Sequence, residues 1–242
     1  MKIYVVGMGA GSEDGITAAA RKALKNADVI VGYTVYADLV KKFLPDKEYF
    51  TSAMKQEADR CRAAAEMAAK GKNVAVVCSG DAGVYGMASL VYEIAAEYED
   101  IEVCVTPGVS AMLSGGALVG APLGHDFAVI SLSDLLTPLE TIEKRLECAA
   151  AGDFVICLYN PSSKKRRDYL KNACDIILKY RDTKTVCAAA RNIGRDGEEY
   201  RVMTLGEMRN YHADMFTTIF IGNSMTKRIK NKMVTPRGYR NV

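Results

Sequence analysis

Short apolar runs alternate with longer amphipathic or alanine-rich segments along the first half of the chain. The short runs are continuously apolar, which is typical of strands buried on both faces. They lie at residues 2–7, 28–31, 73–78 and 101–105. Segments of helical composition lie at 16–27, 55–70, 83–98 and 108–118, and Gly71 is placed to end the second of them. This alternation predicts a mostly parallel sheet covered by helices on both sides.

The stretch GAPLG at 120–124 interrupts this pattern, and we expect a domain boundary there. The predicted domains are 1–119 and 120–242, both of α/β class. In the second half, strand signals resume at 127–132, 154–158, 185–190, 200–203 and 216–221, and helices are expected at 138–151 and 163–180. The last strands leave little room for helices between them, so a mixed sheet with hairpin connections is predicted.

Composition excludes several classes of protein. Of 242 residues, 49% are hydrophobic and 25% charged, as in ordinary globular proteins, and a net charge of +3 is too slight for a dedicated nucleic-acid binder. No apolar run is long enough for a membrane span, and no secretory signal is recognisable. The seven cysteines form no CxxC pair and mostly lie in apolar runs, which favours reduced thiols in a cytoplasmic protein. With two histidines, no metal site is expected.

Three predicted strands run into glycine-containing turns, where ligands can approach the main chain closely. They are VGMGAG at 6–11, SGDAGVYG at 79–86 and TPGVSA at 106–111. The first lacks the third glycine of a dinucleotide-binding fingerprint, because Ser12 stands there. Gly71-Lys72 likewise lacks the rest of a P-loop. Asp81 could bind a ligand's hydroxyl or amino group, or it could cap the following helix. For the third turn, Pro107 could simply set the entry into a helix.

The three turns in this order resemble the tetrapyrrole methylase family, also called class III S-adenosylmethionine-dependent methyltransferases. Further stretches resemble the branch that methylates carbon 17 of precorrin-3B or cobalt-factor III. They are GHDFAVISLSDLLTP at 124–138, LYNP at 158–161, RN at 191–192, DMFTT at 214–218, IGNS at 221–224 and TPRGY at 235–239. The resemblance implies two α/β domains with S-adenosyl-L-methionine bound in a cleft between them. It implies an enzyme of cobalamin biosynthesis that methylates carbon 17 and contracts the macrocycle.

The family implies particular positions for the cofactor. Many relatives have proline near Ala10 and Ala82, where this chain departs from the pattern. The expected cofactor-binding residues are Gly9, Ala10, Ser79, Gly80, Asp81, Val84, Ser110, Ala111, Leu158, Tyr159, Ala190 and Asn192. Because the sulfonium loses its charge as the methyl leaves, a carboxylate against sulfur would favour the ground state. We therefore expect Asp81 to contact hydroxyl or amino groups rather than sulfur.

Ring contraction requires proton transfers, so acid–base residues should face the substrate. His125 is the first candidate because histidine titrates near neutral pH, although it could be structural. Asp134, Arg191 and Tyr85 are further catalytic candidates, and Tyr85 could instead pack in the core. The polycarboxylate tetrapyrrole suits arginine side chains such as Arg191, Arg195 and Arg237. The basic run Lys164–Arg167 could serve the same purpose or begin a solvated helix, whereas His212 is expected on the surface.

Other interpretations remain open at this point. The same fold could methylate another precorrin carbon, diphthine or ribosomal RNA. A carrier that binds tetrapyrroles without catalysis would lack a cofactor site, and an oxidoreductase would need the missing fingerprint. By analogy with the family we expect a homodimer with no nucleic-acid or membrane partner. The resemblance does not distinguish a metal-free substrate from one that already carries cobalt.

Overall fold

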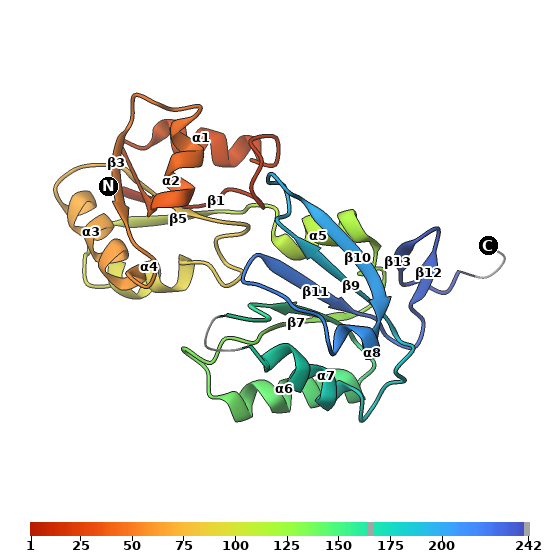
Figure 1. The fold of residues 1–242 in the computed structure, drawn as a ribbon. Helices are drawn as coiled ribbons and strands as arrows, with labels where there is room; N and C mark the ends of the chain where they lie inside the picture. Colours follow the sequence, from red (N-terminus) through yellow and green to blue (C-terminus); the bar gives the residue numbers. More distant parts are fainter. Residues whose placement is uncertain (164–166, 240–242) are drawn as a thin grey trace. The chain divides into compact units, whose positions relative to one another are not determined.

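The first 111 residues contain a five-stranded, wholly parallel sheet (Figure 1). The structure is a computed structural model, and it describes residues 1–163 and 167–239. The chain divides into two units, Met1–Ala111 and Met112–Val242. The division precedes the stretch at 120–124 where the sequence predicts a boundary. The sheet of the first unit has the order β3-β2-β4-β1-β5. Its strands are β1 (Lys2–Gly7), β2 (Val29–Tyr33), β3 (Glu48–Ser52), β4 (Val74–Cys78) and β5 (Glu102–Thr106).

Helices cover both faces of this sheet, as the sequence predicts. They are α1 (Ala18–Asn26), α2 (Thr34–Lys41), α3 (Glu57–Ala69) and α4 (Ala88–Ala95). Alternate residues of β4 point to opposite faces. Val74 and Val76 join a core that includes residues of α3 and α4, whereas Ala75 and Val77 join one that includes residues of α1 and α2. Burial on both faces explains why β4 is an uninterrupted apolar run.

The second unit contains the mixed sheet that the sequence predicts. Its order is β10-β9-β11-β8-β7, in which β7 and β8 are parallel and the other pairs antiparallel. The strands are β7 (Phe127–Ser131), β8 (Val155–Tyr159), β9 (Val186–Arg191), β10 (Glu199–Thr204) and β11 (Thr217–Ile221). Residues of α6 (Leu139–Ala151), α7 (Tyr169–Ile177) and α8 (Leu205–Met208) form a core with this sheet.

Two further elements complete the second unit. Helix α5 (Ala111–Val119) packs closely against the sheet, since a Cβ on Gly115 would lie 2.8 Å from Ile193 Cδ1 and 3.3 Å from the Phe220 ring. A small sheet of order β12-β13-β6 joins β6 (Gly120–Ala121) to a hairpin of β12 (Lys227–Ile229) and β13 (Lys232–Val234). The sequence did not predict this sheet, because its strands have only two or three residues.

Some predicted bounds are wrong for identifiable reasons. Helix α4 begins at Ala88 rather than at residue 83, because Tyr85 has a left-handed backbone and the preceding segment forms turns. Helix α7 begins at Tyr169 rather than near 163. The edge strand β3 and helix α2 were not predicted, since EYFTS in β3 contains no buried residue and does not read as a core strand. The middle of the basic run, residues 164–166, lies outside the described residues.

Candidate functional site

The three glycine turns lie together at the carboxyl edge of the first sheet. Strand β1 pairs in parallel with both β4 and β5, so the turns that follow these strands meet at one edge. The first two turns are hydrogen-bonded to each other. Gly9 N–H donates to Gly80 O at 3.0 Å, and Gly80 N–H donates to Gly9 O at 2.7 Å. Open α/β sheets bind ligands at this edge, which makes it the candidate cofactor site.

These turns require glycine mainly because their main chains lie so close together that a Cβ would not fit. A Cβ on Gly108 would lie 2.2 Å from Gly80 O and 2.5 Å from Gly7 C. A Cβ on Gly7 would lie 2.6 Å from Gly108 N. Gly80 has φ of +66°, which favours glycine for conformational reasons. Gly7, Gly80 and Gly108 therefore interlock, a relationship that the sequence alone does not predict.

Asp81 holds the second and third turns together. One carboxylate oxygen, Oδ1, accepts hydrogen bonds from Gly83 N–H at 2.8 Å and Val84 N–H at 3.1 Å. The other, Oδ2, accepts from Gly108 N–H at 2.9 Å. The carboxylate thus caps its own turn and crosses to the neighbouring one. This resembles the capping alternative from the sequence, although the turn is capped rather than helix α4, whose N-cap is Met87.

Ser110 contributes a buried hydroxyl to the same edge. Its side chain is 3% exposed, and Oγ has no hydrogen-bond partner among the described residues. Gly80 lies close to it, because a Cβ on Gly80 would be 3.6 Å from Ser110 Cα and from Ala111 N. An unsatisfied buried hydroxyl is costly unless a ligand supplies the missing hydrogen bond. Of the other expected cofactor residues in this unit, Ala10, Ser79, Val84 and Ala111 lie partly exposed in the same three turns.

In the second unit, the remaining expected cofactor residues lie at the ends of two strands. Tyr159 ends β8, and its hydroxyl accepts a hydrogen bond from Met112 N–H at 2.8 Å at the start of α5. Asn192 follows β9, with φ of 51° and a hydrogen bond from Nδ2 to Gly197 O at 3.4 Å. Leu158 and Ala190 are fully buried in the sheet. Both residues are also paired with a neighbouring strand on each side, so neither offers accessible surface to a ligand in this structure.

Arg191 is held by two carboxylates at the same edge of the second sheet. Its Nε donates to Asp214 Oδ2 at 2.7 Å, and its Nη1 donates to Glu199 Oε1 at 3.1 Å. Both hydrogen bonds raise the pKa of the guanidinium, and the bond to Asp214 has the larger effect. Burial opposes ionisation of Asp214, but hydrogen bonds from Arg191, Thr217 and Phe216 N–H outweigh it and lower its pKa. Asp214 lies in the DMFTT stretch, whose sequence alone does not show that it orients Arg191.

The structure separates His125 from the other catalytic candidates of this unit. Strands β7, β8 and β9 run in the same direction, so Asp134, Tyr159 and Arg191 follow or end strands at one edge. His125 precedes β7 and therefore lies at the opposite edge, where it is exposed. Its Nδ1 accepts a hydrogen bond from Asp126 N–H at 2.9 Å. Asp134 is exposed, and its Oδ2 accepts a hydrogen bond from the Tyr169 hydroxyl at 2.8 Å.

The other residues singled out from the sequence lie on the surface or over aromatic rings. The Arg195 guanidinium carbon lies 5.7 Å from the centre of the Phe216 ring. Arg167, His212 and Arg237 are exposed. Tyr85 is 54% exposed, which does not support the core-packing alternative.

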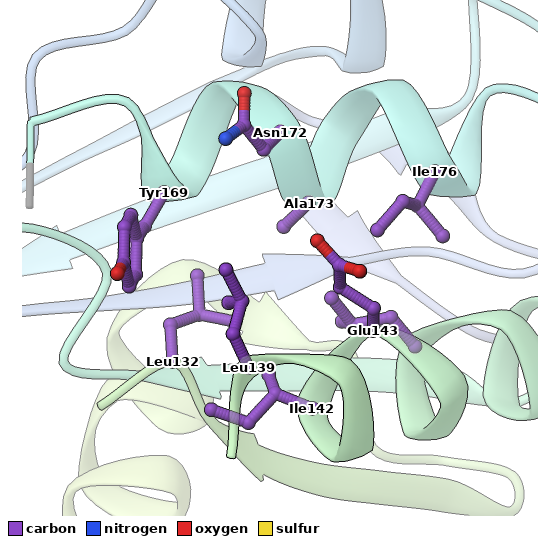
Figure 2. Close-up of a pocket in the computed structure, with 9 residues that line it drawn as sticks. Leu132, Leu139, Ile142, Glu143, Tyr169, Asn172, Ala173 and Ile176 are labelled. Carbon is purple, nitrogen blue, oxygen red and sulfur yellow. The ribbon is translucent and has the colours of Figure 1, made fainter. Parts of the chain in front are cut away.

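A shallow apolar groove between α6 and α7 was not predicted. Figure 2 shows Leu139 and Ile142 of α6 facing Ala173 and Ile176 of α7, with Tyr169 at one end. Tyr169 also bonds Asp134, so it connects the groove to the strand edge. The amphipathic pattern of the two helices could have indicated it, because their apolar faces must meet.

The cysteines are reduced throughout, and five of the seven are buried. Within residues 1–163 and 167–239, no three His, Cys, Asp or Glu side chains are arranged to hold a metal ion. In the same part of the chain, no helix is long and apolar enough to span a membrane.

Comparison with known proteins identifies the family. The family model for tetrapyrrole (corrin/porphyrin) methylases matches residues 2–209, and the chain belongs to this family. It is 44% identical over 238 residues to the probable cobalt-factor III C(17)-methyltransferase of Salmonella typhimurium, covering 98% of this chain and 99% of that protein. It is 40% identical over 246 residues to the precorrin-3B C(17)-methyltransferase of a Sinorhizobium species, covering 98% and 96%.

A solved structure agrees with this assignment. The crystal structure of the methyltransferase CobJ is 38% identical, with a TM-score of 0.89 over 97% of this chain and 99% of that one. Some relatives are longer, and the chain spans 45% and 53% of two of them. The expected family and α/β fold are therefore confirmed.

Proposed function

We propose that the protein transfers a methyl group from S-adenosyl-L-methionine to carbon 17 of a tetrapyrrole of the precorrin-3B or cobalt-factor III type. Contraction of the macrocycle would accompany this step in cobalamin biosynthesis. The observation that carries the proposal is the 44% identity, over nearly the full length of both chains, to a protein named for this reaction. The sibling activities on diphthine or ribosomal RNA have no such support.

The residues at the edge of the first sheet fit the cofactor. The buried Ser110 hydroxyl lacks a partner among the described residues, and a polar atom of the cofactor would supply one. The main chain of Gly9 and Gly80 borders the same place, and the absence of side chains there permits close approach. We assign cofactor binding to Gly9, Ala10, Ser79, Gly80, Val84, Ser110 and Ala111.

Asp81 would act mainly by shaping this site. Three main-chain N–H groups already use its two carboxylate oxygens. A carboxylate that already accepts three hydrogen bonds is stabilised less by further contact with the cationic sulfonium. That agrees with the argument that a fixed carboxylate against sulfur would oppose methyl transfer.

The methyl donor supplies an activated methyl group on a sulfonium when it is bound. The protein must then align the nucleophilic carbon, at about 3–3.5 Å from the methyl group in a productive geometry. Arg191 is suited to bind a substrate carboxylate, because Asp214 and Glu199 fix the plane of its guanidinium. From the family resemblance, Tyr159 and Asn192 are also proposed to take part in cofactor binding, whereas Leu158 and Ala190 are fully buried.

Ring contraction needs groups that move protons, and of the four residues predicted for catalysis, Asp134 and His125 remain candidates for this role. Arg191 stays charged at neutral pH, so it can orient and neutralise carboxylates but cannot act as a base. Asp134 lies at the same edge as Arg191, whereas His125 lies at the opposite one. We therefore expect Asp134→Asn to reduce turnover more than His125→Ala.

The test is a binding and transfer assay with the whole chain. Isothermal titration should show S-adenosylhomocysteine binding to wild-type protein. Incubation with methyl-labelled S-adenosylmethionine and cobalt-factor III should then move label into the macrocycle, at carbon 17 by nuclear magnetic resonance. Precorrin-3B, assayed in parallel, decides which substrate is used. Binding without transfer to either tetrapyrrole would contradict the proposal.

We also propose, from the family resemblance, that the protein acts as a homodimer in the cytoplasm. Light scattering after size exclusion tests the first point. A monomer at micromolar concentration would contradict it.

A further inference from the structure

Tyr85 has a backbone conformation that bulky residues rarely adopt. Its φ is 54°, in the left-handed region where a Cβ is unfavourable. The residue sits in the second glycine turn, four positions after Asp81, and glycines at 83 and 86 flank it. A glycine at position 85 would avoid this cost, so the tyrosine side chain needs an explanation of its own.

The surrounding turn imposes this conformation. Asp81 Oδ1 accepts from both Gly83 N–H and Val84 N–H, which fixes the chain before Tyr85. After it, Gly86 is so close to the preceding turn that a Cβ would lie 2.3 Å from Ala82 O. Ala88 N–H also donates to Ala82 O at 3.1 Å.

A buried arginine holds the far end of the same segment. Arg60 of α3 is 3% exposed, and its Nη1 contacts Met87 Sδ at 3.4 Å. Its Nε donates to Ser52 Oγ at 2.9 Å. The segment from Asp81 to Met87 is thus held at both ends, and Tyr85 has little freedom to relax. Strained residues persist where their surroundings over-determine them, and they cluster at functional sites.

Core packing does not compensate for the backbone strain at Tyr85, because more than half of this residue is exposed. Strand β4, which precedes this turn, lies between β1 and β2 in the sheet. On the β1 side are the glycine turns assigned to the cofactor. On the other side, the segments after β2 and β3 carry two exposed apolar side chains, Val35 and Met54. Strand β4 thus separates the glycine-rich part of the edge from the part that carries Val35 and Met54, and Tyr85 lies in the turn that follows β4.

We infer that Tyr85 is a substrate-contacting residue that presents its ring to the face of the tetrapyrrole. This inference rests on the proposed function and assigns part of the substrate-binding surface. An aromatic side chain offers a large rigid surface to a ring system, and the fixed backbone reduces the entropy lost on binding. The ring, rather than the hydroxyl, makes the contact.

The experiment compares three substitutions with one matched control. Tyr85→Gly removes the ring and relieves the backbone, Tyr85→Asn removes the ring but tolerates this φ, and Tyr85→Phe keeps the ring without the hydroxyl. The control is Lys230→Gly, which relieves another left-handed residue, φ 47°, in the β12–β13 turn of the second unit. For each variant, thermal unfolding, affinity for S-adenosylhomocysteine, and kcat and KM with cobalt-factor III or precorrin-3B are measured, whichever the wild type methylates.

We expect Tyr85→Gly and Tyr85→Asn to raise the KM for the tetrapyrrole at least about tenfold, as for loss of a substantial apolar contact. Affinity for S-adenosylhomocysteine should stay within about twofold and Tm should not fall. Tyr85→Phe and Lys230→Gly should keep wild-type kinetics. Unchanged KM in Tyr85→Gly overturns the inference, as does a parallel loss of S-adenosylhomocysteine affinity or equal impairment of Tyr85→Phe. If wild-type protein methylates neither tetrapyrrole, the proposed function itself fails, which is a different result.

Discussion

The carboxylate of Asp81 accepts a hydrogen bond from Gly108 N–H at 2.9 Å, although the two residues belong to different turns. Its other oxygen serves two N–H groups of its own turn. We predict that Asp81→Ala weakens S-adenosylhomocysteine binding about tenfold or more, because hydrogen bonds to a charged group are each worth about 1.5–3 kcal/mol. Isothermal titration measures the affinity, and urea unfolding should show a parallel loss of stability.

Asp59→Ala is the matched control for this change. Asp59 lies in the first turn of α3 and has an exposed ion pair with Arg62, a type of contact worth about 0.2–1 kcal/mol. It should leave affinity for S-adenosylhomocysteine unaltered. Equal affinity of Asp81→Ala and wild type would show that the turns keep their shape without the carboxylate.

Gly108→Ala should disrupt the site by a steric route. Its Cβ would enter the space of Gly80 O and Gly7 C, both backbone atoms that cannot move alone. We expect destabilisation of roughly 1–3 kcal/mol, as in overpacked cores, with loss of detectable S-adenosylhomocysteine binding. Differential scanning fluorimetry with and without S-adenosylhomocysteine measures both effects.

Gly116→Ala provides the comparison. Gly116 lies in helix α5, and outside the backbone of that helix the nearest atom to its Cβ would be Leu123 Cδ1 at 3.6 Å. Alanine is favoured over glycine in helices by about 1 kcal/mol, so this variant should be as stable as wild type or more so. A Gly108→Ala protein that retains ligand-induced stabilisation would refute the interlocking of the turns.

The pair of Arg191 and Asp214 should give an acid-dependent contribution to stability. Because the pKa of Asp214 is lowered in the folded state, the contribution is complete above the ordinary value of 3.8 and disappears as pH falls through the lower folded pKa. The difference in free energy of unfolding between wild type and Asp214→Asn should therefore be constant from about pH 5 to 7 and shrink below about pH 4.

Asp175→Asn is the control for Asp214→Asn, because it removes a similar carboxylate–arginine pair that lies outside the proposed substrate site. The hydrogen bond from Arg209 lowers the pKa of Asp175, so this variant should show the same acid dependence. Only Asp214→Asn should also reduce turnover, because it leaves the Arg191 guanidinium less well oriented. Equal turnover of the two variants would exclude Arg191 from the substrate site.

Thiol labelling should follow burial. Burial raises the pKa of the Cys78 thiol to about 11 and that of the Cys61 thiol to about 12, which leaves very little reactive thiolate at pH 8. Cys148 is exposed. In native protein, iodoacetamide should modify Cys148 first, whereas denaturant should expose all seven cysteines to mass-spectrometric detection. Rapid native labelling of Cys78 would contradict the burial of β4.

The sequence predicted well those elements whose residues face the interior on both sides. Strands β4 and β8 are almost completely buried, so their continuous apolar runs predicted both strands correctly. Strand β3 lies at the sheet edge and has no buried residue, so its pattern resembled a loop. The start of α4 was also wrong, because Asp81 and Gly86 keep the preceding residues in turns.

The sequence placed the three glycine turns at the ends of the correct strands but could not show how they fit together. Contact of Gly7 with Gly108 depends on strand order, and strand order follows from tertiary packing. For the same reason, nothing local revealed that Asp214 would orient Arg191. His125 illustrates the opposite case, since its residue type suggested chemistry while the strand direction places it at the far edge from Arg191.

The interlocked glycines also bear on how the protein is made. Gly7 leaves the ribosome before Gly80, and Gly80 before Gly108, and each requires the others for its position. A nascent chain that does not yet extend beyond Gly108 therefore cannot assemble the turns, whatever helices it has formed. Affinity for S-adenosylhomocysteine should accordingly emerge abruptly with chain length, as a late reporter of completed folding in this unit.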